Sequence, residues 1–212
     1  MSSRESSKAK KIQILDATTR LLKSKGLQAL SFENVASEAG LSRQLIRYYF
    51  TDLESLMVDL CDHLGNGYRD TLIAGVVDVG QVERLKFFLD FFFDLSETRQ
   101  MPDNLEVYDA LVAFSVGSAR LRDRMCEQYK VLGQVMVHEL AIAYPELDGT
   151  ACEEISFVFV SMMHAHWSFV ASLGHSRAHS KLNRQAMQRL IESYVNADVT
   201  EPVMERPWSR EA

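Results

Sequence analysis

The sequence has few of the residues that break or cross-link a chain. Its 212 residues include only four prolines, ten glycines and three cysteines. Collagen-like chains and many disordered chains are much richer in proline and glycine, so these classes are excluded. Cys61, Cys126 and Cys152 are far apart and odd in number, which excludes a disulfide framework or a thiolate metal cluster. We expect reduced, partly buried thiols, with a redox-sensing cysteine as the alternative.

Long apolar runs are also missing. The longest are five residues, for example 110–114 and 140–144. A membrane-spanning helix needs about 20 apolar residues. The polar N-terminus lacks the apolar core of a signal peptide. We therefore expect a cytoplasmic protein that has no membrane partner.

Common local signatures of catalysis are absent from the sequence. It contains no G-x-S-x-G, H-E-x-x-H, G-x-x-x-x-G-K-[ST] or G-x-G-x-x-G motif. His164 and His166 are two residues apart, so on a helix they point about 200° from each other and cannot share a metal ion as an i,i+4 pair could. We therefore expect neither an enzyme nor a metal or cofactor site.

Charge is abundant and unevenly distributed. The formal net charge is −6, yet residues 1–50 hold nine Lys and Arg against four Asp and Glu. Residues 51–212 hold fourteen against twenty-five. A basic N-terminal region on an acidic body favours a module that binds a polyanion, joined to a region with a different task.

Apolar residues recur at three- and four-residue spacing through most of the chain, which predicts an all-α fold. Ser31 and Ser42 are suited to cap the starts of helices, and Gly26 and Gly40 are suited to end them. We expect helices over residues 8–25, 32–39, 43–50, 53–72, 81–98, 103–116, 118–144, 150–174 and 182–197.

Two of the short predicted helices, 32–39 and 43–50, are joined by a tight turn that contains Gly40, which is the sequence form of a helix-turn-helix. At about 100° per residue, one face of the second helix is apolar. The other face carries Arg43, Gln44, Arg47 and Tyr48.

The polar face suits a DNA major groove. Arg can bind guanine and Gln can bind adenine with paired hydrogen bonds, and each good pair gives about 1–3 kcal/mol of discrimination. Lys10 and Lys11 lie in the preceding helix and could neutralise phosphates. The alternatives are a plain solvated face, or an adaptor whose helix-turn-helix binds protein; the basic surplus favours DNA.

The N-terminal sequence resembles the tetracycline-repressor (TetR) family over about residues 8–60. The matching residues are Ile14–Ala17, Leu21–Leu22, Gly26, Ser31–Gln44, Tyr49–Phe50, Glu54 and Leu56. The resemblance implies an all-helical homodimer that binds a palindromic operator and releases it when a small molecule enters the C-terminal domain. It also implies that Ser31 and Tyr49 meet phosphate.

We therefore predict three regions: a DNA-binding domain over 8–54, a helical ligand-binding and dimerisation domain over 55–198, and flexible tails at 1–7 and 199–212. The predicted DNA contacts are Lys10, Lys11, Ser31, Ser42, Arg43, Gln44, Arg47, Tyr48 and Tyr49. The partners are duplex DNA, an effector that the sequence does not identify, and a second copy of the chain.

Two sets of residues in the larger domain are candidates for these further roles. An aromatic and Met-containing set can form either ordinary core, the default, or the wall of an effector pocket; it comprises Phe88, Phe92, Met163, His166 and Trp167. A stripe of small side chains allows close approach of another helix and suits either a dimer interface or packing within one subunit; it comprises Ser161, Ala165, Ser168 and Ser172.

Overall fold

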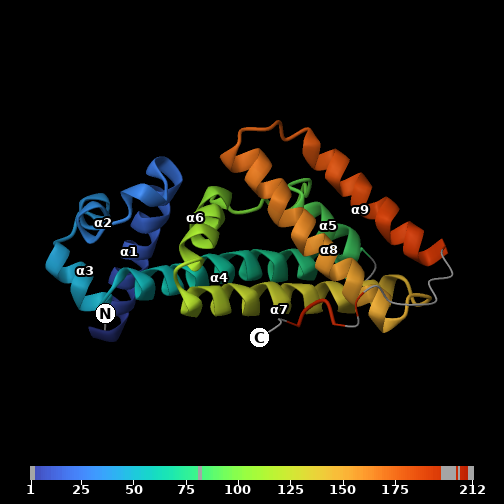
Figure 1. The fold of residues 1–212 in the computed structure, drawn as a ribbon, viewed down its shortest axis with the longest axis horizontal. Coiled ribbons are helices and arrows are strands. Elements are labelled where there is room, and N and C mark those ends of the chain that lie inside the picture. Colours follow the sequence, from blue (N-terminus) through green and yellow to red (C-terminus); the bar gives the residue numbers. More distant parts are fainter. Residues whose placement is uncertain (1–2, 81–82, 197–203, 205, 210–212) are drawn as a thin grey trace. The chain divides into compact units, whose positions relative to one another are not determined.

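The computed structural model describes residues 3–80, 83–196, 204 and 206–209, and these residues form helices joined by turns (Figure 1). The all-α prediction is confirmed. The elements are α1 (Ser3–Lys25), the 3-10 turn η1 (Leu27–Ala29), α2 (Phe32–Ala39), α3 (Arg43–Tyr49), α4 (Leu53–Val79), α5 (Arg84–Phe92), α6 (Leu105–Ser115), α7 (Ala119–Ala143), α8 (Gly149–Trp167), the π-helical segment η2 (Ser168–Ser172) and α9 (His179–Asn196).

Several helix boundaries differ from the predicted ones. Helix α4 continues to Val79, beyond the predicted end at 72. Helix α5 ends at Phe92, although we predicted a helix to 98. The reason is a left-handed residue, Asp94, with φ of 56°. It lets the Leu95 N–H bond back to the Asp90 carbonyl at 2.8 Å, which closes the helix as a Schellman-type end.

Parts of the two predicted flexible tails are ordered in the structure. Residues 3–7, predicted to be flexible, are the first part of α1. Residues 1–2 lie outside the described part of the chain, as do most residues of the predicted tail at 199–212. Within that second tail, Met204 and residues 206–209 are described and pack on helices, as shown below.

The chain divides into two compact units, each formed from two stretches of sequence. Unit 1 comprises Met1–Tyr68 and Pro102–Cys126, and unit 2 comprises Arg69–Met101 and Glu127–Ala212. Helices α4 and α7 each contribute residues to both units.

The interior of unit 1 is apolar and draws on each of its first four helices. The buried residues are Ile14, Leu15, Ala17, Leu21 and Leu22 of α1, Val35 and Ala36 of α2, Ile46 of α3, Phe50, and Leu56, Met57 and Leu60 of α4. Because α2 and α3 are too short to be stable alone, α2 is held in place by its contacts with α1, and α3 by its contacts with α2.

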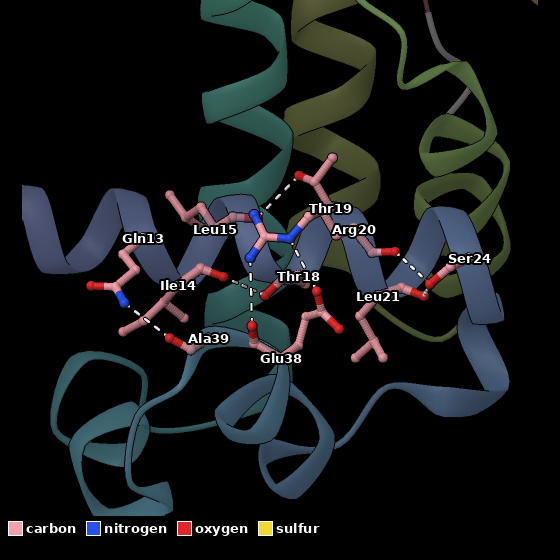
Figure 2. Close-up of polar contacts among 10 residues, drawn as sticks. All are labelled: Gln13, Ile14, Leu15, Thr18, Thr19, Arg20, Leu21, Ser24, Glu38 and Ala39. Atoms are coloured by element: carbon pink, nitrogen blue, oxygen red, sulfur yellow. Dashed lines mark hydrogen bonds and ion pairs between the residues drawn. The ribbon is translucent and has the colours of Figure 1, made fainter.

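Polar side chains on α1 fix the end of α2 (Figure 2). The Gln13 amide donates to the Ala39 carbonyl at 2.9 Å, and Arg20 Nε donates to Glu38 Oε1 at 3.0 Å. Thr18 is fully buried and its hydroxyl bonds within α1 to the Ile14 carbonyl at 2.8 Å, so it leaves no unpaired polar group in the core.

Helix α4 is tied to its neighbours within unit 1 by charged groups. On the α1 side, Lys11 Nζ lies 2.6 Å from Asp59 and His63 Nε2 lies 2.8 Å from Asp16. At the start of α7, the Ser118 hydroxyl donates to Glu54 Oε1 at 2.5 Å. These contacts set the direction in which α4 leaves the helix-turn-helix.

Helix α8 and η2 together form the most apolar segment of unit 2. By length and composition alone, Gly149–Ser172 could cross a membrane. This finding differs from our expectation, which considered only unbroken apolar runs. Small and polar residues interrupt the segment, but its average hydropathy stays high. Within the protein, Ile155, Phe159 and Met163 of this segment are completely buried.

No disulfide joins Cys61, Cys126 or Cys152, as predicted. Cys61 and Cys152 are buried and Cys126 is half-buried. Burial raises the pKa of Cys61 to about 12 and also raises the pKa of Cys152. Because the thiolate is the reactive form, these two thiols are poor redox sensors.

The C-terminal segment, residues 204 and 206–209, packs on α7 and α8 within unit 2. Trp208 Nε1 donates to the Ser156 hydroxyl at 2.8 Å, and the Trp208 ring meets the Phe157 ring edge-on at 5.2 Å between centroids. A Cβ atom on Gly133 would lie only 2.1 Å from the Trp208 ring, so this ring occupies the space above the glycine.

Exchanging Gly133 should therefore have opposite effects with and without the Trp208 ring. Gly133→Ala alone is expected to displace the ring and lower the free energy of unfolding by about 1 kcal/mol, because the added Cβ overpacks the site. In the Trp208→Ala background the same exchange should raise it by up to about 1 kcal/mol, because alanine favours a helix interior over glycine. Urea unfolding followed by circular dichroism at fixed protein concentration measures both effects. Equal effects in the two backgrounds would contradict the packing of Trp208 on Gly133.

Candidate nucleic-acid interface

The turn between α2 and α3 is short because one glycine takes a left-handed conformation. Gly40 has φ of 64°, and the following Leu41 N–H bonds back to the Ala36 carbonyl at 3.0 Å. A residue with a side chain would be strained at this φ. The turn therefore brings the chain directly from α2 into α3.

Serine side chains cap the starts of both helices, as predicted. The Ser31 hydroxyl accepts from the Asn34 N–H at 3.1 Å, and the Ser42 hydroxyl accepts from the Leu45 N–H at 3.2 Å. Each cap satisfies a backbone donor that a helix leaves unpaired at its first turn. The caps fix where α2 and α3 begin, and so fix which side chains of α3 face outward.

Helix α3 has the two faces that its sequence predicts. Ile46 is fully buried, and Phe50, which follows the helix, is 1% exposed. Arg43, Gln44, Arg47 and Tyr48 are exposed, and Tyr48 is 79% exposed. Such a large exposed aromatic side chain is not explained by packing within unit 1. The structure therefore brings four of the predicted DNA contacts together on one outward face.

The two arginines of α3 are held by the first turn of α2. The Arg43 guanidinium forms an ion pair with Glu33. The Arg47 guanidinium lies over the Phe32 ring, 5.5 Å from its centroid. The sequence did not single out Glu33 for this role; its only signal is an opposite charge ten residues before Arg43, across the predicted turn.

The remaining predicted DNA contacts have mixed surroundings. Tyr49 is half-buried and its ring lies edge-on to Tyr48 at 5.2 Å between centroids. Lys10 Nζ donates to the Gln13 amide oxygen at 3.0 Å. Lys11 pairs with Asp59 and also lies over the Phe50 ring, 5.6 Å from its centroid. Lys11 is thus engaged inside unit 1, whereas the α3 face points outward.

The predicted pocket residues gather in an aromatic cluster of unit 2. Phe88 and Phe92 lie 4.9 Å apart between ring centroids, and Phe92 stacks on Trp167 at 6.1 Å. Trp167 Nε1 donates to the Phe92 carbonyl at 3.0 Å, and Met163 is completely buried. These contacts bring the predicted residues together in one place, as either a core or the wall of a pocket requires.

His166 is a buried polar member of the same region. The side-chain NH2 group of Asn183 has two hydrogens to donate. One is donated to the His179 carbonyl at 3.0 Å and the other to His166 Nδ1 at 3.1 Å. His166 is therefore the neutral tautomer with the proton on Nε2, which donates to the Ser180 hydroxyl at 3.1 Å. Burial lowers the pKa of His166, helped by His179 and opposed by Asp94.

The predicted small-residue stripe lies on the outer side of α8 and η2. Ser161, Ala165 and Ser172 are exposed and Ser168 is half-buried. Phe169, in the same segment, is 52% exposed. Most of this stripe is therefore exposed in the part of the chain that the structure describes.

The arrangement of α2 and α3 defines a helix-turn-helix protein. The family model of "Bacterial regulatory proteins, tetR family" matches residues 14–60. That range contains the turn, both caps and the α3 face. No curated protein matches the chain in sequence.

Solved structures are similar in fold over most of the chain. A TetR transcription regulator from Haloarcula marismortui is 16% identical, with a TM-score of 0.75 over 88% of this chain and 98% of that one. A transcriptional regulator from Saccharomonospora viridis in complex with choline is 18% identical, with a TM-score of 0.72 over 88% of this chain and 96% of that one. The multidrug binding protein EbrR in complex with ethidium is 19% identical, with a TM-score of 0.62 over 85% of this chain and 98% of that one.

Residues 14–60 therefore match the N-terminal region of the tetR family, and most of the chain has the fold of a TetR transcription regulator.

Titration of His166 should make unit 2 less stable in acid. The unfolded His has a pKa of about 6.5, and the folded value is lower. The unfolded state then binds more protons between the two values, so stability present above pH 6.5 is lost as the pH falls. His166→Gln should reduce the loss of unfolding free energy between pH 7.5 and 5, by at most about 1.4 kcal/mol per pH unit.

Urea unfolding at a series of pH values measures this loss. His138→Gln provides the control, because His138 is exposed on α7. An unchanged pH profile in His166→Gln would contradict the buried, neutral state of His166.

Proposed function

We propose that this protein is a transcriptional regulator that binds a palindromic DNA operator as a homodimer, represses transcription there and is released by a small-molecule inducer. The observation that carries the proposal is the exposed face of α3, with Arg43, Gln44, Arg47 and Tyr48 on one capped helix of a tetR-family region. The proposal gives the protein no catalytic step and assigns its action to the cytoplasm.

Base recognition is the task of α3 in this proposal. Arg43 and Gln44 stand at the start of the helix, which is the end that enters a major groove in helix-turn-helix proteins. Both carry paired donors or a donor and an acceptor, as readout of guanine or adenine requires. The Ser31 hydroxyl and the Tyr49 ring flank this face and are assigned to phosphate, which positions the helix without reading sequence.

Two copies of α3 are needed because a seven-residue helix reads few base pairs. In a two-fold dimer the two recognition helices are about 34–36 Å apart and read successive major grooves of a palindrome. The mostly exposed stripe of Ser161, Ala165, Ser168 and Ser172 supports a dimer interface on α8 and η2, since small side chains let a second helix approach closely.

The effector is assigned to the aromatic region of unit 2. The similar structures that hold choline and ethidium support a small-molecule site in this fold. Asp90 and Glu139, the carboxylates near the aromatic segment, are already paired with Arg184 and Arg84 at 2.8 and 2.5 Å. An effector that favours one dimer state over another by about 1–3 kcal/mol would change operator affinity 5- to 150-fold.

Replacing the polar side chains of α3 should weaken sequence recognition. The full-length protein is used to select duplexes from a random library, and the affinity for the selected duplex and its single-base variants is measured by fluorescence anisotropy. Arg43→Ala and Gln44→Ala should each lose about 1–3 kcal/mol of discrimination at particular base pairs. Lys130→Ala removes a cation from the exposed surface of α7 and serves as the charge-matched control for Arg43→Ala.

The salt dependence of binding distinguishes DNA recognition from the adaptor alternative. Log affinity for DNA should fall with log salt at a slope of about −0.9 per phosphate neutralised. A protein that selects no duplex, or that keeps full discrimination in both α3 variants, would contradict the proposal and favour a helix-turn-helix that binds protein.

A charged side chain on the outer surface of α8 should prevent dimerisation. Ala165→Arg places an unpaired cation in the proposed interface, where burying it is costly. The variant is expected to have the mass of a monomer in light scattering at micromolar concentration and to lose affinity for a palindrome more than for a half-site. Ala141→Arg, on the exposed surface of α7, is the control. A dimer that survives Ala165→Arg would place the interface elsewhere.

A further inference from the structure

The first turn of α2 supports both arginines of the α3 face. Glu33 forms an ion pair with Arg43, and Phe32 lies beneath the Arg47 guanidinium. The two supporting residues are not equivalent: Phe32 is buried in the core, whereas the Glu33 side chain is 57% exposed. Glu33 thus places a carboxylate on the surface that is otherwise suited to approach an anionic duplex.

Stability does not account for the ion pair between Glu33 and Arg43. The Arg43 side chain in the pair is 52% exposed, and ion pairs between exposed groups contribute little to folding. Glu33 lies in the first turn of α2, where the helix dipole favours a carboxylate by about 0.3–1 kcal/mol. That effect requires no contact with Arg43, so the ion pair needs another explanation.

The chemistry of the guanidinium supplies one. Arg43 contacts Glu33 through Nη1, and a guanidinium has five N–H donors in a rigid plane. A carboxylate on one nitrogen leaves the other donors free for guanine O6 and N7, which need two hydrogen bonds in that plane. An arginine already held in one orientation loses less side-chain freedom when it binds.

The Glu33 carboxylate should also weaken non-specific binding of Arg43 to DNA phosphates. A phosphate offers Arg43 charge attraction without any requirement for a particular base. Glu33 already neutralises part of that attraction and repels a nearby phosphate. A base that matches the free donors of Arg43 keeps its hydrogen bonds, so the carboxylate weakens non-specific binding more than specific binding.

We propose that Glu33 is a positioning residue that sets base specificity through Arg43, favouring a guanine at the base pair that Arg43 reads. This inference rests on the proposed DNA binding of α3. It assigns Glu33 no contact of its own with a base.

A second carboxylate on α2 provides a matched control. Glu38, near the other end of the helix, pairs with Arg20 Nε at 3.0 Å (Figure 2). It belongs to the same helix, carries the same charge and also pairs with an arginine, but that arginine lies on α1 and not on α3. Removing Glu38 therefore reproduces the change in charge without releasing Arg43.

The test compares Glu33→Ala and Glu38→Ala, each in the natural chain and in the Arg43→Ala background. Affinities are measured by fluorescence anisotropy for the duplex that the natural protein selects from a random library and for a scrambled duplex of equal length. Glu33→Ala should bind the scrambled duplex more tightly and lower the ratio of selected to scrambled affinity by about 5- to 50-fold. Glu38→Ala should change this ratio less than about twofold.

The Arg43→Ala background identifies the route of the effect. There, Glu33→Ala should change the ratio less than about twofold, because the residue that Glu33 positions is gone. Glu33→Gln, which keeps the size and an acceptor oxygen, should give a ratio between those of the natural chain and Glu33→Ala. Circular dichroism checks that each variant is folded, and Glu33→Gln carries the test if Glu33→Ala does not fold.

Three results would overturn the inference. They are an unchanged ratio in the Glu33 variants, an equal loss in the Arg43→Ala background, and an equal loss in Glu38→Ala. Failure of the natural protein to select any duplex is a different outcome, because it overturns the proposed DNA binding itself.

Discussion

The candidate interface depends on one backbone turn. Gly40 takes a left-handed conformation, so that only three residues separate the end of α2 from the start of α3. The Ser42 cap then fixes the first turn of α3, and burial of Ile46 fixes the rotation of the helix about its axis. With Ile46 facing the core, the opposite side of α3 must face outward. That side carries Arg43, Gln44, Arg47 and Tyr48. The surface is thus a consequence of how the turn closes and how the core fills.

Several basic side chains of the first fifty residues are held in place by ion pairs. The basic surplus of the first fifty residues attracts a polyanion without regard to sequence. Much of it is already engaged: Arg20 with Glu38, Lys11 with Asp59, and Arg43 with Glu33. Pairing fixes where each cation stands, so the module combines a general attraction with a small number of oriented donors.

The sequence predicted the helix-turn-helix well because its determinants are local. Ser31, Gly40 and Ser42 act within a few residues, and the two faces of α3 follow from helical spacing. It did not predict contacts made over long separations. Trp208 packs against Gly133, for example, and only the folded chain brings these two residues together. The sequence also did not predict the early end of α5, because Asp94 takes a left-handed conformation that is more usual for Gly. The candidate pocket and dimer residues could be grouped by their spacing, yet spacing alone cannot distinguish a core from a cavity.

The position of Trp208 also makes the surface of unit 2 depend on residues far apart in sequence. Trp208 covers Gly133 of α7 and donates to the Ser156 hydroxyl of α8. Proteolysis near residue 204 would therefore uncover Gly133 and remove the indole donor from Ser156. Unit 1 contains no residue beyond Cys126, so such a cut would remove nothing from it.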